Sequence, residues 1–196
     1  MGTFSLETVK RIREMTGAGV VDVKKALEES SQDEALALEI LKKRGQAKAL
    51  KKSDREAKEG LIASYIHSNG KIGVLVKLLC ETDFVARNDD FVSLGKDLAM
   101  HIAALSPRVV SPEEVPEEEV QSERRLWEER LAEEKKPVSL HANILAGKEK
   151  KFREESALLT QAFVKDPSKT VAQHIAESVA KMGENIRVGG FVRFEL

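Results

Sequence analysis

The chain has 196 residues, of which 41% are hydrophobic, enough for a folded core. Its 32 lysines and arginines are balanced by 33 aspartates and glutamates. This balance argues against a protein that coats nucleic acid, because such proteins carry a large basic excess. No segment approaches the roughly 18 apolar residues of a membrane span, charged residues begin at Glu7 with no apolar signal sequence before them, and the single cysteine suits a reducing compartment. We therefore expect a cytoplasmic protein with no membrane segment and no direct nucleic-acid binding.

The N-terminal segment shows the pattern of three short helices. Ser5 can cap the first helix, and the stretch from Thr16 to Gly19 interrupts it, because its two glycines permit the positive φ of a tight turn. Asp33 can cap the third helix, and Gly45 is expected to end it. Apolar residues recur at helical spacing in all three helices: Leu6, Val9, Ile12 and Met15; Val20, Val23, Ala26 and Leu27; Leu36, Ala37, Ile40 and Leu41. We expect residues 1–45 to form a three-helix domain.

A charged segment leads from this domain to a β-hairpin. Residues 46–59 are rich in alanine and in charges of both signs, which predicts a helical linker that ends at Gly60. A strand is expected over residues 61–67, and Asn69-Gly70 predicts a type I′ turn after it. The second strand of the hairpin has apolar side chains at alternate positions, which places them on one face: Ile72, Val74, Val76, Leu78 and Cys80.

The rest of the chain is mainly helical and closes with a strand. We expect helices from Asn88 to Leu105 and over residues 116–135, 139–155 and 171–182, a loop at 106–116, a turn at Asp166-Pro167-Ser168, and a strand at 186–196. This order is that of an α+β fold, in which the hairpin and the returning strand form a three-stranded antiparallel sheet with helices on one face. Residues 60–196 are expected to form this core.

No pattern in the chain points to the active site of an enzyme. Neither a glycine-rich phosphate-binding loop nor a nucleophile elbow is present, and the four histidines lack the spacing of metal ligands. His101 and His174 lie at helical apolar stripes, where a packed histidine is expected, and Cys80 is expected in the core. We predict a protein that is not an enzyme and holds neither a cofactor nor a metal.

Two segments are not required by the local structure, and they carry a resemblance. The first, TGAGVVDVKKAL, runs from Thr16 to Leu27, and the second, CETDFVARN, runs from Cys80 to Asn88, about 60 residues further on. Together they resemble the two signatures of the bacterial elongation factor Ts family. The resemblance spans essentially the whole chain and is weakest over residues 108–160; its further matches are at 45–60, 73–76, 96–101, 163–166, 182–185 and 193–196.

The resemblance implies a fold that agrees with the pattern of elements. The family has an N-terminal three-helix domain of the ubiquitin-associated type and a core with a three-stranded antiparallel sheet. The length resembles that of the short members, which have a single core unit, and residues 117–155 look like a modest version of the helical hairpin of longer members. The chain departs from the family at Ala162, where proline is common, and at Gly189-Gly190, which weaken the last strand.

The resemblance also implies a function. Members of the family are guanine-nucleotide exchange factors for elongation factor Tu, which they bind in its GDP-bound and nucleotide-free states. The matching segment here is Thr82, Asp83, Phe84 and Val85, of which Asp83 and Phe84 would insert into the partner, dislocate its magnesium and release GDP. The positions that match a second contact, made by the N-terminal domain, are Lys10, Arg13, Val20, Val21 and Lys24.

Other interpretations of these residues stay open at the level of sequence. Thr82 or Asp83 can cap a helix and Phe84 can pack in the core, while Val20 and Val21 cannot both face inward on one helix. A ribosome- or RNA-associated protein would use the basic residues between Lys48 and Lys58, and a general adaptor of the ubiquitin-associated type would use residues 1–45 alone.

The predicted sheet also bears on the oligomeric state. The sheet carries apolar rows and has two faces, and the helices of one chain are not expected to cover both; the rows are Ile72, Val74, Val76 and Leu78 and, on the last strand, Val188 and Val192. The resemblance adds that short members of the family are similar to half of the duplicated core of longer ones, which a symmetric dimer would rebuild. We therefore expect a homodimer, and one without an intermolecular disulfide because Cys80 is expected to be buried.

Overall fold

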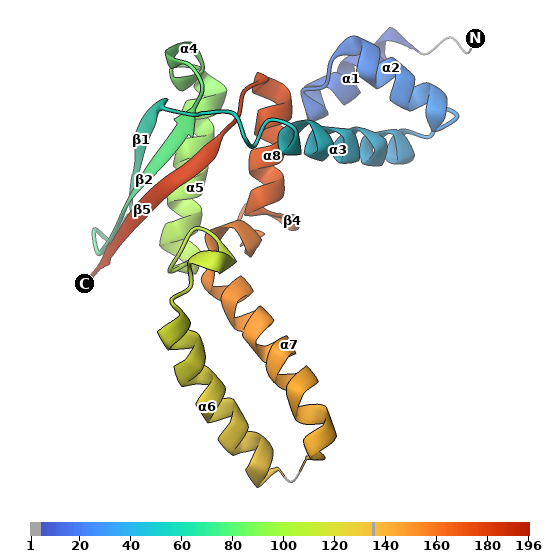
Figure 1. The fold of residues 1–196 in the computed structure, drawn as a ribbon. Coiled ribbons are helices and arrows are strands. Elements are labelled where there is room, and N and C mark those ends of the chain that lie inside the picture. The colour runs from blue at the N-terminus through green and yellow to red at the C-terminus, as the bar shows by residue number, and fades with distance from the viewer. Residues whose placement is uncertain (1–4, 135) are drawn as a thin grey trace.

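The computed structural model describes residues 5–134 and 136–196 and contains helices together with a three-stranded antiparallel sheet (Figure 1). The α-helices are α1 (Leu6–Thr16), α2 (Val20–Glu29), α3 (Glu34–Leu50), α4 (Asp83–Ala86), α5 (Asp89–Leu105), α6 (Glu117–Glu133), α7 (Val138–Ser156) and α8 (Val171–Met182). The strands are β1 (Glu59–Ile66), β2 (Ile72–Cys80), β3 (Ala162–Phe163), β4 (Asp166–Thr170) and β5 (Arg187–Glu195). The mixed fold with an antiparallel sheet agrees with the α+β prediction.

The three N-terminal helices enclose a small apolar cluster of their own. The Ser5 hydroxyl accepts a hydrogen bond from the Thr8 N–H at 3.0 Å and caps α1, which ends at Gly17 with φ 65°. The cluster consists of Val9, Ile12, Val23, Ala26, Leu27, Ala37 and Leu41. The expected stripes were too wide, because Leu6, Met15 and Val20 are exposed. That these helices have the ubiquitin-associated arrangement stays a prediction.

The third helix does not end where the glycine predicted. It continues through Gly45 to Leu50, so the expected end at Gly45 is wrong. The helical linker expected over 46–59 is helical only as far as Leu50, because residues 51–58 form turns and irregular backbone. Gly45 serves a close approach instead, since a Cβ there would lie 3.4 Å from the Cβ of Ala180 on α8. A single straight helix therefore crosses the expected domain boundary, and the division into domains stays a prediction.

The sheet has the order β1-β2-β5, with both pairs antiparallel. Between β1 and β2 only Gly70 has a positive φ, of 67°, so the expected type I′ turn, which needs two such residues, is wrong. The pairing of β2 with β5 shifts by one residue at Lys77, opposite Gly190 and next to Gly189. A Cβ on Gly189 would lie 2.9 Å from Leu79 Cδ1, so the two glycines accommodate a bulge.

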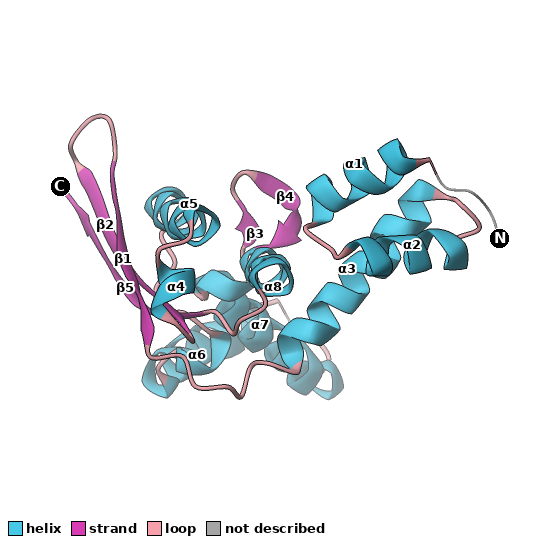
Figure 2. Ribbon diagram, turned by 90° about the horizontal axis from the view of Figure 1, so that it is seen from above, coloured by secondary structure: helices cyan, strands magenta, loops and turns pink. Residues whose placement is uncertain are grey.

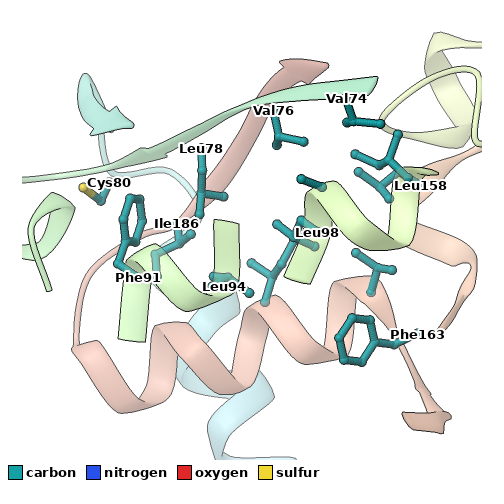
Figure 3. Close-up of a cluster of buried hydrophobic side chains, with 14 of the residues drawn as sticks. Val74, Val76, Leu78, Cys80, Phe91, Leu94, Leu98, Leu158, Phe163 and Ile186 are labelled. Atoms are coloured by element: carbon teal, nitrogen blue, oxygen red, sulfur yellow. The ribbon is translucent and has the colours of Figure 1, made fainter. Parts of the chain in front are cut away.

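The main core lies between one face of the sheet and α5, with α8 behind it (Figures 2 and 3). Figure 3 shows Val74, Val76 and Leu78 of β2 above Leu94 and Leu98 of α5. The opposite face of the sheet is not covered by any helix of the described residues (Figure 2), and its exposed apolar side chains are Ile62, Ile66, Leu75, Val192 and Phe194. The prediction that helices cover one face is confirmed.

The segment between the two halves of the core forms a helical hairpin. Helices α6 and α7 have 17 and 19 residues, agree closely with the helices expected over residues 116–135 and 139–155, and project away from the sheet (Figure 1). Trp127, Leu131 and Leu145 are buried between them. After this hairpin, Asp166-Pro167-Ser168 lie in strand β4 and not in a turn. The missing N–H of Pro167 is tolerated there because β4 belongs to a two-stranded sheet that has only edges.

Candidate partner-binding site

The short helix α4 carries Phe84 at the junction between β2 and α5. Thr82 caps this helix, since its hydroxyl accepts a hydrogen bond from the Val85 N–H at 3.4 Å. Asn88 then caps α5, accepting from the Asp90 N–H at 2.8 Å. Two caps within seven residues let the chain leave the strand, make one helical turn and start a new helix. Of the two residues that could cap a helix here, Thr82 or Asp83, it is Thr82 that does so.

Phe84 projects from this turn into the surroundings of the protein. Its exposed fraction is 84%, whereas Val85 and Ala86, next along the turn, are partly buried and packed against the main core. The interpretation that Phe84 is a core residue is therefore wrong. The turn is attached through Val85 and presents the phenyl ring outward, which is unusual for so large an apolar side chain in a monomer.

Asp83 stands beside the ring and forms an ion pair with Arg87. Asp83 Oδ2 lies 3.1 Å from the Arg87 guanidinium, and the Arg87 side chain is 81% exposed. An exposed pair of this kind contributes at most about 1 kcal/mol to stability. The carboxylate is therefore free to exchange this partner for another at small cost.

One residue that contacts this turn was not found by sequence reasoning. Glu184 lies in the loop after α8, and its carboxylate accepts hydrogen bonds from the backbone N–H groups of Glu81 and Thr82, each at 3.0 Å. It also accepts from the Thr82 hydroxyl at 2.7 Å. The segment 182–185 stood out only through its resemblance to the family, because no local pattern predicts a contact between residues more than 100 positions apart.

The second predicted contact lies on the N-terminal helices. Lys10, Arg13 and Lys24 are exposed, and so are Val20 and Val21, with exposed fractions of 40% and 65%. Val20 and Val21 begin α2 after Gly19, and the helix turns Val23, Ala26 and Leu27 inward. The expectation that at least one of the two valines is exposed is confirmed, and in fact both are.

The two predicted contact regions both lie towards the upper end of the molecule in Figure 1, with α8 between them. Lys10 and Arg13 of α1 line an open cleft of about 600 Å³ together with Asn88 and Asp90, which directly follow α4. Lys181 of α8 also lines it and bonds Asp90 at 2.7 Å.

The histidines singled out earlier belong to packing and not to this site. His101 is buried, its Nδ1 accepts from the Val164 N–H at 3.1 Å, and its Nε2 bonds Gln161 at 3.0 Å. Burial lowers the pKa of His101, although the hydrogen bond to Gln161 opposes the shift. His174 stacks on Phe163, with ring centroids 4.2 Å apart. These contacts confirm the expectation of packed histidines.

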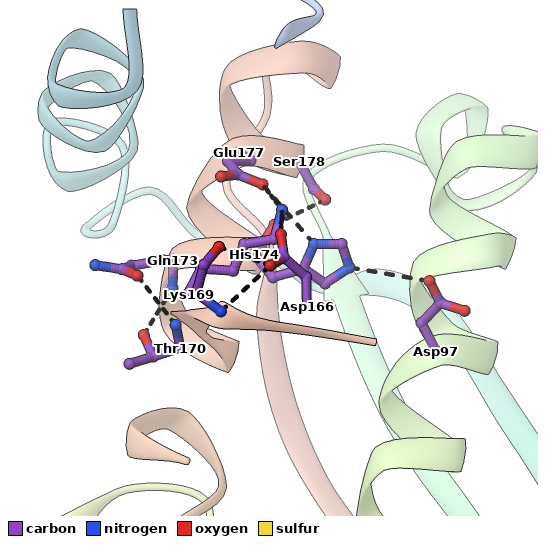
Figure 4. A network of polar contacts seen from close by, with 9 residues as sticks. Asp97, Asp166, Lys169, Thr170, Gln173, His174, Glu177 and Ser178 are labelled. Carbon is purple, nitrogen blue, oxygen red and sulfur yellow. Dashed lines mark hydrogen bonds and ion pairs between the residues drawn. The ribbon is translucent and has the colours of Figure 1, made fainter. Parts of the chain in front are cut away.

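Around His174 lies a network of charged side chains between α5, β4 and α8 (Figure 4). Its ring nitrogens lie 4.0 Å from Asp97 and 3.9 Å from Glu177, and Lys169 bonds Glu177 at 2.6 Å. Burial acts to lower the pKa of Lys169, but its hydrogen bonds and ion pairs with Glu177 and Asp166 together outweigh that effect, so the pKa is raised. Across residues 5–134 and 136–196, no group of three or more histidine, cysteine or acidic side chains is placed to hold a metal ion.

Cys80 ends strand β2 just before the α4 turn, and it is buried as expected. Its thiol donates to the Thr82 carbonyl oxygen at 3.1 Å. Burial raises the pKa of the thiol to about 11, and the nearby Glu184 carboxylate adds to the shift. A thiol with this pKa stays protonated at neutral pH and is a poor nucleophile.

Comparison with known proteins decides the family. A family model described as elongation factor TS matches residues 5–196. The chain belongs to the elongation factor Ts family. Proteins named elongation factor Ts from Fervidobacterium nodosum and Thermosipho melanesiensis are 50% and 51% identical to it, over 98% and 97% of both chains. The one from Rubrobacter xylanophilus is 51% identical over 97% of this chain and 98% of its own.

Membership of the elongation factor Ts family implies a function in the elongation step of translation. The family is one of nucleotide exchange factors and not of catalytic enzymes, and membership of the family implies interaction with elongation factor Tu. None of the helices described here is both long and apolar enough to cross a membrane. The matched region includes both α4 and the N-terminal helices.

Proposed function

We propose that this chain is the guanine-nucleotide exchange factor of elongation factor Tu and acts on it in the cytoplasm. The observation that carries the proposal is the phenyl ring of Phe84, 84% exposed on a turn anchored to the core, with a carboxylate beside it. An apolar ring held outward by a rigid turn is suited to enter a pocket of a partner, because its position is set before binding.

The turn acts as a wedge between the partner and its nucleotide. Phe84 enters the GTPase domain near the groups that hold the magnesium and the phosphates of GDP, and Asp83 follows it. Burial of the ring favours the displaced state, and the Asp83 carboxylate repels the phosphates at close range. Magnesium is dislocated and GDP leaves, because only a ligand that binds the nucleotide-free state more tightly can shift the equilibrium towards it.

The N-terminal helices provide the second contact. Val20 and Val21 offer an exposed apolar pair, and Lys10, Arg13 and Lys24 are exposed basic residues on the same two helices. Exposed apolar side chains accompanied by polar ones are typical of a protein interface. Binding through these helices adds to the contact made by the α4 turn.

Three basic side chains of the segment that suggested RNA binding already lie in ion pairs with carboxylates. Lys48 pairs with Asp22 at 2.6 Å, Arg55 approaches Glu81 to 3.6 Å, and Lys58 pairs with Glu56 at 2.7 Å. Cations that are already paired with carboxylates have less to gain from phosphates. We therefore propose a protein partner and no direct role in nucleic-acid binding.

We also propose that two copies of the chain associate through the uncovered face of the sheet. Its five exposed apolar side chains, named above, form a surface that two antiparallel sheets can bury by packing face to face. Cys80 lies buried on the other face, under α5, so no disulfide is expected across such an interface.

The direct test is release of a fluorescent GDP analogue from purified elongation factor Tu. Addition of this chain at about one tenth of the partner's concentration should accelerate release many-fold, because an exchange factor turns over. Phe84→Ala should lose this acceleration. Its matched control is Val138→Ala, which shortens another highly exposed apolar side chain, at the start of α7 and away from both contacts. Absence of acceleration with an active partner would overturn the proposal.

A further inference from the structure

The loop that follows α8 holds the α4 turn through a single carboxylate. Gly183 ends α8 in the left-handed conformation, with φ 81°, and turns the chain so that Glu184 faces the end of β2. The Glu184 carboxylate accepts three hydrogen bonds there: from the N–H of Glu81, from the N–H of Thr82, and from the Thr82 hydroxyl. All three lie between 2.7 and 3.0 Å.

These three donors belong to Glu81 and Thr82, the two residues that join β2 to the α4 turn. A helix of four residues has little stability of its own, because its nucleation cost is not recovered by propagation. The backbone N–H groups before it have no partner within the helix. A carboxylate that accepts two adjacent N–H groups satisfies them with charge-assisted hydrogen bonds, which are about twice as strong as neutral ones.

Glu184 also orients the helix cap itself. The Thr82 hydroxyl donates a hydrogen bond to Glu184 and accepts one from the Val85 N–H. Because the hydroxyl hydrogen is held by the carboxylate, a lone pair of the hydroxyl oxygen faces the helix. Val85 is the residue that attaches the turn to the core. The direction in which Phe84 leaves the turn thus depends on Glu184, although the two side chains have no hydrogen bond between them.

The Glu184 loop also forms hydrogen bonds with Glu81 and with the segment that follows α3. Asn185 donates its backbone N–H to the Glu81 carboxylate at 2.6 Å, and its side-chain amide donates to the carbonyl oxygens of Ser53 and Arg55 at 3.1 and 2.7 Å. These residues follow α3, the helix that carries the N-terminal surface. These hydrogen bonds hold the Glu184 loop in place, so the loop can fix the position of the α4 turn.

We propose that Glu184 is a positioning residue for the exchange reaction, which sets the orientation of the Thr82–Val85 turn and so of the Phe84 ring. This inference rests on the proposed function. Glu184 does not need to touch the partner for this role, and its effect on exchange should pass through Phe84.

The test combines Glu184→Ala and Glu184→Gln with a matched control, Glu114→Ala. Glu114 also accepts from a backbone N–H, that of Val110 at 3.1 Å, and from the Ser111 hydroxyl at 3.5 Å, but it lies at the base of the α6–α7 hairpin. Glu184→Ala should lower the exchange rate by about tenfold or more, since three hydrogen bonds are lost. Glu184→Gln keeps an acceptor oxygen and should lower it less, and Glu114→Ala should leave it unchanged.

Two readouts distinguish positioning from a general loss of structure. In a Phe84→Ala background, Glu184→Ala should add less than about a twofold further loss, because coupled residues are not additive. Amide hydrogen exchange at residues 81–86 should accelerate in Glu184→Ala, while that of β2 stays protected.

The inference is overturned if Glu184→Ala exchanges GDP as fast as Glu114→Ala, or if the losses from Glu184→Ala and Phe84→Ala multiply in full. Failure of the proposed function would be recognised separately. In that case the unaltered chain would not accelerate GDP release, or Phe84→Ala alone would leave the rate unchanged.

Discussion

Replacement of Phe84 by alanine separates binding from folding, because the ring is mostly outside the core. Burying a fully exposed phenylalanine side chain is worth about 1.5–3 kcal/mol. With an exposed fraction of 84% in the free chain, about 1.3–2.5 kcal/mol is left to be gained when a partner covers the ring. At about 1.4 kcal/mol per factor of ten, Phe84→Ala should weaken binding to nucleotide-free elongation factor Tu about 8- to 60-fold.

The effect on stability should be small by comparison. Surface substitutions away from caps and buried groups usually change the free energy of unfolding by less than about 0.5 kcal/mol, which corresponds to about 1–2 °C in melting temperature for a chain of this size. Loss of a core phenylalanine would instead cost about 3–5 kcal/mol. Binding is measured by titration calorimetry and stability by thermal melts. A variant that melts far below the original chain, yet binds and exchanges normally while folded, would refute the reasoning.

Three further predictions follow from single side chains. Phe194→Asp places a charge on the uncovered sheet face, where Phe194 is 72% exposed, so light scattering at about tens of micromolar should change from dimer to monomer; a monomer before the substitution would contradict the proposed dimer. Because burial lowers the pKa of His101 below its ordinary 6.5, the unfolded chain binds more protons, so stability should fall as the pH drops below 6.5. Urea unfolding at pH 5 and 7 should show a smaller pH dependence for His101→Gln, and an equal dependence would argue against this assignment. Finally, maleimide should label Cys80 slowly at pH 8, since the pKa of this buried thiol is about 11; labelling at the rate of the unfolded chain would contradict its burial.

Hydrophobic periodicity and helix-capping residues predicted helices and strands well where a residue type has a single structural role. Strand β2 was found from its alternating apolar residues, Ser5 and Asp33 cap the helices they were expected to cap, and Asn88 caps the helix expected to begin there. Such features are visible in the sequence because the interacting groups lie within four residues of each other. The long-range contacts have no such signature.

The structural role of a glycine is the feature that sequence reasoning predicted least well. Gly45 was expected to end a helix, but it lies inside α3 where that helix crosses Ala180 of α8. The same residue type serves a turn, a bulge or a close approach, and the choice depends on a neighbour far along the chain. For this reason the length of α3 could not be predicted from the sequence.

The candidate site was predicted in part and by two different routes. The exposure of Phe84 could not be derived from the pattern alone, since an apolar residue at a helix start can pack or project; the resemblance favoured projection, and the structure shows the ring exposed. Glu184 could not be found at all, because its three donors lie about 100 residues earlier in the chain. Only tertiary structure brings that carboxylate to the turn.

The central claim, that the chain binds the nucleotide-free state of its partner preferentially, is tested most directly by measuring its affinity for elongation factor Tu at increasing GDP concentration. Coupling between two ligands is reciprocal, so GDP must weaken the complex by the same factor by which the complex weakens GDP binding. We predict that the apparent Kd of the complex rises with GDP concentration until it equals the Kd for GDP-saturated elongation factor Tu, and that binding of the chain lowers the affinity for GDP by the same factor. An affinity that is the same with saturating GDP and with no nucleotide would contradict the account.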